Sequence, residues 1–179
     1  MAGPVSVGVV AALEGFDVAT EFPGVADSKK LSEKKREKIF EMLEARVALG
    51  DVRYAVELES AETIDREGIA AAVRRALDRG VNTLAPDSAQ VRVLLDGSLK
   101  APSEYAQETI IGGDASVPII SLASVVAKVV RDRLMVQLAQ QYPEYSFEIH
   151  KGYGTKKHYE ALQKHGLCAI HRRTFVHLT

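Results

Sequence analysis

The sequence predicts an α/β or α+β domain built on one mixed sheet, with a helical C-terminal part. Short apolar runs of strand type alternate with longer amphipathic stretches, and the long helical stretches come late in the chain. No repeat, and no linker rich in Gly, Ser or Pro, divides the 179 residues, which suffice for one sizeable core. We therefore expect a single domain over residues 1–179.

The predicted strands are short, apolar and bounded by turn or charged residues. They cover residues 5–12, 52–58, 90–95 and 109–111. The run at 90–95 is expected to be buried, and Asp96 stands at its end.

The predicted helices begin near residues that can cap a helix N-terminus. They cover residues 34–46, 60–80, 118–141 and 155–166. Ser28 or Ser32 can cap the first, Ser60 the second and Thr155 the last. Gly80 is expected to end the second helix, because glycine favours the position after a helix C-terminus.

Composition narrows the class of protein. The hydrophobic fraction of 46% and the charged fraction of 26% are ordinary for a soluble globular chain. The single cysteine, Cys168, rules out an intramolecular disulfide and a cysteine zinc cluster, and it fits a reducing cytoplasm. No apolar run is long enough for a membrane span, so we expect a cytoplasmic protein without a membrane partner.

The net charge of −1 hides an uneven distribution. Between Ser146 and Thr179 basic residues outnumber Glu148 and Glu160, and all five histidines, His177 included, fall there. This basic tail is a candidate surface for phosphates. The alternative is a solvated helix face that binds nothing.

Two carboxylates are candidate metal ligands. Asp96 ends an apolar strand, and Asp114 follows Gly112-Gly113 at the start of a helical stretch. Ligands favour the carboxyl ends of strands in open α/β sheets, and paired glycines let the backbone approach a phosphate or a metal. Alternatively, Asp96 simply turns the chain and Asp114 complements a helix dipole.

Two further segments have the composition of phosphate-binding loops. In residues 150–158, Tyr153 can stack on a base or sugar while Lys151 and Thr155 hold phosphates; the alternative is a surface turn before a helix. In residues 26–32, Ser28 and Lys29 stand at a helix start, where an anion is favoured; the alternative is a capped basic helix terminus.

Together these segments resemble bacterial ribonuclease HII over nearly the whole chain. The runs that carry the resemblance are Ala26-Asp27-Ser28-Lys29-Lys30-Leu31-Ser32, Glu62-Thr63-Ile64-Asp65, Leu95-Asp96-Gly97, Gly113-Asp114, residues 123–134, His150-Lys151-Gly152-Tyr153-Gly154-Thr155-Lys156 and Ile170-His171-Arg172-Arg173. The resemblance implies a ribonuclease H-like mixed sheet flanked by helices. It also implies a monomeric Mg²⁺- or Mn²⁺-dependent endonuclease of DNA replication and repair, which cleaves the RNA strand of RNA–DNA hybrids and nicks 5′ to ribonucleotides embedded in DNA.

The resemblance also implies roles for individual residues. Asp96 and Asp114 resemble the third and fourth catalytic, metal-binding carboxylates of the family. Tyr153 resembles the tyrosine that packs against the deoxyribose beside the ribonucleotide, and Lys29 resembles a lysine near the substrate backbone. Ser28, Lys151 and Thr155 complete the expected substrate-binding set.

The sequence departs from the family at its start. The family's Asp-Glu-Ala-Gly-Arg-Gly strand, with two carboxylates, has no counterpart before Ala2-Gly3-Pro4-Val5. We therefore expect an N-terminally truncated chain that lacks the first, central strand, so that its two neighbours expose unpaired edges and the fold is marginal. The alternatives to an active nuclease are a catalytically dead hybrid-binding module and a non-functional fragment.

Overall fold

A computed structural model describes residues 1–176, so His177 of the basic tail lies outside the described residues. The described chain forms two compact units. The Asp96 unit comprises Val7–Glu57 and Arg74–Val129. The Tyr153 unit comprises Met1–Ser6, Leu58–Val73 and the chain from Val130 onward. The prediction of one domain stays a prediction.

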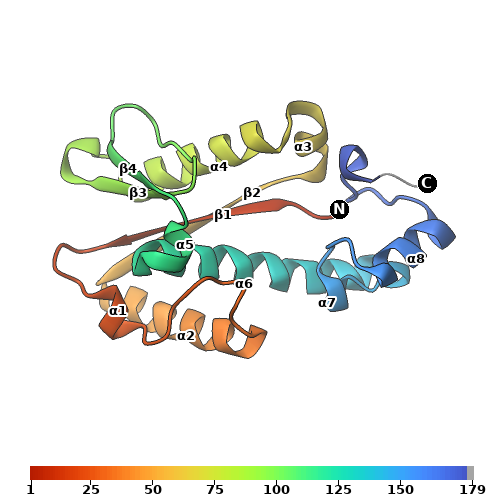
Figure 1. Cartoon of the computed structure of the whole chain (residues 1–179), viewed down its shortest axis with the longest axis horizontal. Helices are drawn as coiled ribbons and strands as arrows, with labels where there is room; N and C mark the ends of the chain where they lie inside the picture. Colours follow the sequence, from red (N-terminus) through yellow and green to blue (C-terminus); the bar gives the residue numbers. More distant parts are fainter. Residues whose placement is uncertain (177–179) are drawn as a thin grey trace. The chain divides into compact units, whose positions relative to one another are not determined.

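The strands form two separate pairs. They are β1 (Val5–Ala12), β2 (Val52–Glu59), β3 (Arg92–Asp96) and β4 (Ala106–Ile110). Strand β1 pairs with β2, and β3 pairs with β4 (Figure 1). Within residues 1–176 no ladder joins the two pairs, so the edges of β1 and β3 lack a strand partner, as expected from the sequence. Whether the fold is therefore marginal stays a prediction.

Helices make up most of the remaining regular structure, and the chain after Val130 is helical as expected. They are α1 (Val18–Glu21), α2 (Glu33–Leu49), α3 (Ala61–Glu67), α4 (Ile69–Leu84), α5 (Gly113–Ser116), α6 (Pro118–Gln141), α7 (Phe147–His150) and α8 (Lys156–His165), with 3₁₀ turns η1 (Ser88–Gln90), η2 (Pro143–Tyr145) and η3 (Arg173–Phe175). Ser32, Ser60 and Thr155 cap α2, α3 and α8, each accepting a backbone N–H three residues on.

The prediction of one helix from Ser60 to Gly80 was wrong. Gly68, with φ of 84°, ends α3, and α4 then runs through Gly80 to Leu84. Gly80 serves packing instead: a Cβ there would lie 2.8 Å from Cγ2 of Val9 on β1. An absent side chain at this position therefore allows α4 to approach the strand closely.

A still closer contact lies between β1 and α6 in the Asp96 unit. A Cβ at Gly8 would overlap the carbonyl oxygen of Ala123 and would lie 3.1 Å from Cβ of Ala127. Val125 and Val126, on the same part of α6, are fully buried. Small residues at the crossing thus bring the helix backbone onto the strand.

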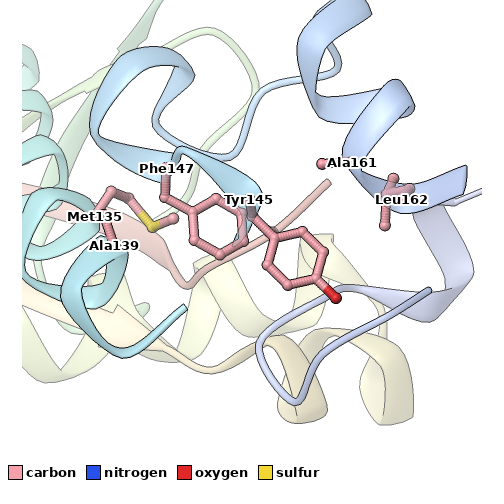
Figure 2. Packing of buried hydrophobic residues seen from close by; sticks show 7 residues of the cluster. Met135, Ala139, Tyr145, Phe147, Ala161 and Leu162 are labelled. Carbon is pink, nitrogen blue, oxygen red and sulfur yellow. The ribbon is translucent and has the colours of Figure 1, made fainter. Parts of the chain in front are cut away.

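The Tyr153 unit has its own apolar core, shown in Figure 2. Its buried members are Ala2, Met135, Ala139, Tyr145, Phe147, Ala161 and Leu162. The rings of Tyr145 and Phe147 stack with centroids 5.3 Å apart. The Tyr145 hydroxyl remains satisfied, because it donates to the carbonyl of Gly166 at 3.0 Å.

We predict that Gly8→Ala lowers the free energy of unfolding by about 2 kcal/mol, the usual cost of forcing an extra carbon into a packed core. The obstacle is backbone, which cannot rotate away. Gly80→Ala is the matched control, because its nearest obstacle is a side-chain methyl and alanine favours a helix by about 1 kcal/mol. Urea unfolding of both variants measures the difference, and equal losses would contradict the packing argument.

Candidate active site

The parallel pairing of β3 and β4 determines where Asp96 lies. The register pairs Arg92 with Ala106 at one end and Asp96 with Ile110 at the other. Beyond the ladder, the Gly97 N–H donates to the Ile110 carbonyl at 3.0 Å. Because parallel strands finish at the same edge, the Asp96 carboxylate and the chain that leaves β4 lie together.

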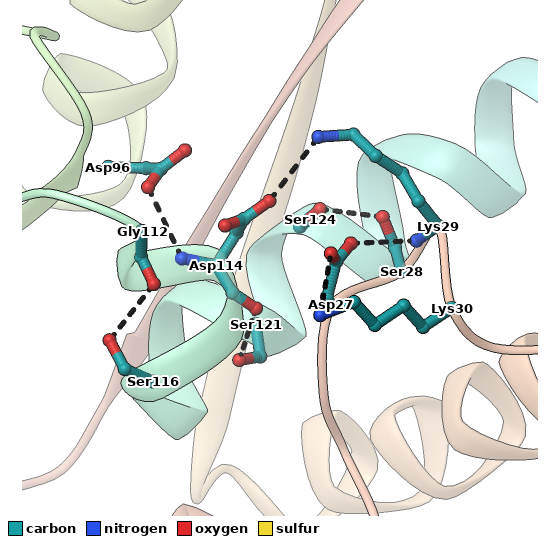
Figure 3. Close-up of polar contacts among 10 residues, drawn as sticks. All are labelled: Asp27, Ser28, Lys29, Lys30, Asp96, Gly112, Asp114, Ser116, Ser121 and Ser124. Carbon is teal, nitrogen blue, oxygen red and sulfur yellow. Dashed lines mark hydrogen bonds and ion pairs between the residues drawn. The ribbon is translucent and has the colours of Figure 1, made fainter.

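Asp114 reaches this edge through the two glycines before it. Gly112 adopts φ of 68°, and a Cβ at Gly113 would lie 2.7 Å from Cδ1 of Ile120 and 3.6 Å from Oδ1 of Asp96. The Asp114 N–H donates to Asp96 Oδ1 at 3.3 Å, and its carbonyl accepts from Ser121 Oγ at 2.7 Å (Figure 3). The structure thus brings the two predicted carboxylates together.

The 26–32 loop supplies a cation to the same place. Lys29 Nζ lies 3.5 Å from Oδ2 of Asp114, although the lysine side chain is 78% exposed. Its backbone N–H donates to Oδ1 of Asp27 at 2.9 Å. Ser28 is 3% exposed, and its Oγ lies 2.7 Å from Oγ of Ser124 on α6. Ser28 therefore anchors the loop, and Lys29 is the member that faces the carboxylates (Figure 3).

The donor set at this edge suits a hard divalent cation. Asp96 and Asp114 offer carboxylate oxygens, and Mg²⁺ typically binds through one or two carboxylates while it keeps several waters. Within residues 1–176 no cluster of three or more His, Cys, Asp or Glu side chains could hold a metal. Asp96 and Asp114 are thus the candidate cation ligands at this edge, and their role as metal ligands stays a prediction.

The remaining predicted site residues belong to the Tyr153 unit. Tyr153 is 51% exposed, and the guanidinium of Arg131 lies 5.2 Å from its ring centroid. Thr155 accepts the His158 N–H at 3.3 Å as the cap of α8. Lys151 is only 9% exposed, and its Nζ donates to the Glu148 carbonyl at 2.6 Å. The Lys151 ammonium is thus engaged by α7, and its contact with substrate stays a prediction.

Three buried histidines lie within or beside residues 150–158, the Tyr153 loop, and the sequence assigned none of them an individual role. They are His150, His158 and His171. Burial lowers the pKa of each histidine. The pKa of His158 falls to about 4, because electrostatic repulsion from His150, His171 and the Met1 α-amino group adds to the effect of burial. Glu148 raises and Lys157 lowers the pKa of His150 to a smaller extent.

Comparison with known proteins identifies the relationship. The family model described as Ribonuclease HII matches residues 1–178. The chain belongs to the ribonuclease HII family. The ribonuclease HII of Endomicrobium trichonymphae is 48% identical over 176 residues, covering 97% of this chain and 80% of that protein. The ribonuclease HII of Burkholderia thailandensis is 43% identical over 173 residues, covering 97% and 78% respectively. The family consists of type 2 ribonuclease H endonucleases.

Solved structures share the fold. The ribonuclease HII of Archaeoglobus fulgidus, solved in complex with PCNA, matches with a TM-score of 0.72 at 21% identity, over 97% of this chain and 87% of that one. Ribonuclease H2 from Pyrococcus horikoshii OT3 matches with a TM-score of 0.63 at 23% identity, over 95% and 93%. These likenesses confirm the ribonuclease H2 type of α/β fold. None of the helices within residues 1–176 combines the length and apolar character that a membrane crossing requires.

We predict that Lys29→Met raises the affinity for Mn²⁺, because the variant removes a positive charge beside Asp114. The gain should reach at most about fivefold, since an exposed ion pair is worth about 1 kcal/mol or less. Lys30→Met is the matched control, because Lys30 Nζ lies 3.9 Å from Asp27 instead. Calorimetric titration measures both, and an equal change in the two variants would refute the placement of Lys29.

We also predict that acid destabilises the chain through its buried histidines. The unfolded chain takes up a proton at His158 near pH 6.5, whereas the folded chain takes it up only near pH 4. The contribution to stability is therefore present above pH 6.5 and is lost as the pH falls towards 4. His158→Asn should weaken this dependence in thermal melts at pH 7 and pH 5. The exposed His165→Asn should not, and identical pH profiles for all three proteins would contradict the prediction.

Proposed function

We propose that this chain cleaves the RNA strand of RNA–DNA hybrids and nicks 5′ to ribonucleotides embedded in DNA, with Mg²⁺ or Mn²⁺ held by Asp96 and Asp114. One observation carries the proposal. The parallel β3–β4 register sets Asp96 at a sheet edge where the Asp114 N–H reaches its carboxylate at 3.3 Å. Membership of the ribonuclease HII family supports the choice of reaction and substrate. We also propose that the protein is cytoplasmic and monomeric.

The residues at this edge have distinct tasks in the proposed reaction. Bound divalent cations activate the attacking water and stabilise the leaving 3′ oxygen in such hydrolyses. Asp96 and Asp114 hold the cation through their carboxylates. Lys29, exposed and beside Asp114, is placed to shift from the carboxylate to a phosphate of the arriving backbone.

Tyr153 and its loop are the proposed substrate contact in the other unit. Its half-exposed ring, with Arg131 close to it, is suited to pack against a sugar or a base. Thr155 stands exposed two residues on and can bind a phosphate. Recognition of RNA over DNA requires a contact to the 2′-OH, which is the local mark that distinguishes the two.

We expect the 179-residue chain to turn over slowly. Two carboxylates balance only part of the charge of a cation pair, and one of them already lies beside Lys29. This observation favours a second candidate function, hybrid binding without cleavage. Such a module would bind a ribonucleotide-containing duplex with an affinity that falls as salt rises, and would not nick it in Mg²⁺ or Mn²⁺.

Asp96→Asn should reduce nicking of a duplex with one embedded ribonucleotide to background and weaken Mn²⁺ binding by at least about tenfold, the loss typical of damage to a metal site. Duplex binding should largely remain, because the Tyr153 loop is untouched. Asp87→Asn is the matched control, since asparagine can still cap η1. Nicking or Mn²⁺ affinity at the level of the unaltered chain would refute the metal assignment. Binding without nicking by the unaltered chain would select the second function.

A further inference from the structure

The three buried histidines of the Tyr153 unit form hydrogen bonds that the proposed reaction does not require. His158 is fully buried, and His150 and His171 are nearly so. The rings of His150 and His158 stack at 4.4 Å, and Phe147 packs its ring against all three. A buried imidazole costs free energy unless its nitrogens are hydrogen-bonded. The hydrogen-bond partners of each ring therefore show which part of the chain the ring holds.

The bonds of His171 and His158 run in one direction. The backbone N–H of Cys168 donates to His171 Nδ1 at 2.9 Å, which places the His171 proton on Nε2. The Nε2–H of His171 donates to Nε2 of His158 at 3.0 Å, so the His158 proton lies on Nδ1. His158 Nδ1 then donates to the carbonyl oxygen of Tyr153 at 2.9 Å. Neutral imidazoles can form this series of three hydrogen bonds in one arrangement of protons only.

The His150 side chain forms a hydrogen bond to the same loop at Gly152, one residue before Tyr153. The Gly152 N–H donates to His150 Nδ1 at 3.2 Å, and His150 Nε2 therefore donates to the Tyr145 carbonyl at 2.8 Å. Histidine side chains thus hold the Lys151–Gly152 peptide group and the Tyr153–Gly154 peptide group. The rest of the Tyr153 side chain is left half exposed.

The loop needs such support because its backbone is unusual. Lys151 adopts φ of 51°, a left-handed conformation that costs a non-glycine residue free energy. Gly152 follows with φ of 80°, and a Cβ there would lie 2.5 Å from the Ala2 carbonyl oxygen. Arg131 Nη1 donates to the Lys151 carbonyl at 3.0 Å and secures the start of the turn. The conformation before Tyr153 is therefore set by contacts from outside the loop.

We propose that His158, oriented by His171, is a positioning residue that fixes the Tyr153 carbonyl and so presents the Tyr153 ring to the nucleic-acid substrate. This inference rests on the proposed role of Tyr153 in substrate binding. The lowered pKa values of the three histidines support this proposal. The hydrogen bonds from His171 to His158 and on to the Tyr153 carbonyl require imidazoles that stay neutral at pH 7. His158 has no contact with substrate in this scheme and acts through the loop backbone.

A pair of substitutions at each histidine separates positioning from mere packing. An asparagine amide stands near the Nδ1 position of histidine, and a glutamine amide stands near the Nε2 position. His158→Asn can therefore still donate to the Tyr153 carbonyl, whereas His158→Gln reaches only towards His171. At position 171 the order reverses, because His171→Gln can still donate to His158 and His171→Asn cannot.

Binding of a DNA duplex with one embedded ribonucleotide, measured in EDTA to prevent nicking, gives the readout. His158→Asn should bind within about twofold of the unaltered chain, and His158→Gln should bind about fivefold more weakly, equivalent to one lost hydrogen bond. His171→Gln should retain more affinity than His171→Asn. The same rank order for Asn and Gln at both positions would overturn the proposal. Exposed His165→Gln serves as the control.

Two measurements separate failure of this inference from failure of the proposed function. Nitrogen-15 spectra of the histidines in the unaltered chain should show His158 protonated on Nδ1, and His150 and His171 on Nε2, without any substrate. Other tautomers, or charged rings at pH 7, would overturn this series of hydrogen bonds whatever the chain binds. Tyr153→Ala should weaken binding at least as much as His158→Gln. Unchanged binding by Tyr153→Ala would refute the substrate role of Tyr153, and the positioning role with it.

Discussion

The parallel ladder between β3 and β4 is the constraint on which the Asp96 unit depends. It places the carboxyl ends of two strands at one edge, so Asp96 and the turn after Ile110 meet without a long connection. Gly112 and Gly113 then let the chain reverse within contact of the Asp96 carboxylate. The juxtaposition of Asp96 and Asp114 therefore follows from backbone pairing.

The Tyr153 unit solves a different problem with different chemistry. A loop that must show an aromatic ring cannot bury that ring to secure it, so its backbone is held from below. Neutral histidines suit this task because each offers one donor and one acceptor on a rigid, packable ring. His158 and His150 thus join the apolar core around Phe147 to the peptide groups beside Tyr153. The histidines therefore connect the apolar core directly to the exposed loop.

Sequence reasoning predicted that Asp96 and Asp114 form one candidate site because the signals for both residues are local. A carboxylate after an apolar strand and a second one after paired glycines both stand out in the sequence. It did not foresee that Ser28 is buried against Ser124, or that the Lys151 ammonium bonds to the Glu148 carbonyl on α7. The burial of Ser28 depends on α6 packing over its loop. Gly80 misled for the same reason, because glycine permits both a helix end and a close crossing, and only the position of Val9 distinguishes them.

The sequence by itself determined the family, the fold class and the caps of α3 and α8, and it predicted the two candidate carboxylates. Each of these rests on residue type and short spacing, which persist in an unfolded chain. The tertiary structure decided that Asp96 accepts the Asp114 N–H, that Lys29 lies beside Asp114, and that His158 is hydrogen-bonded to His171. Such facts join residues far apart in the chain. They arise only when burial removes water and each polar atom must find a partner within the protein.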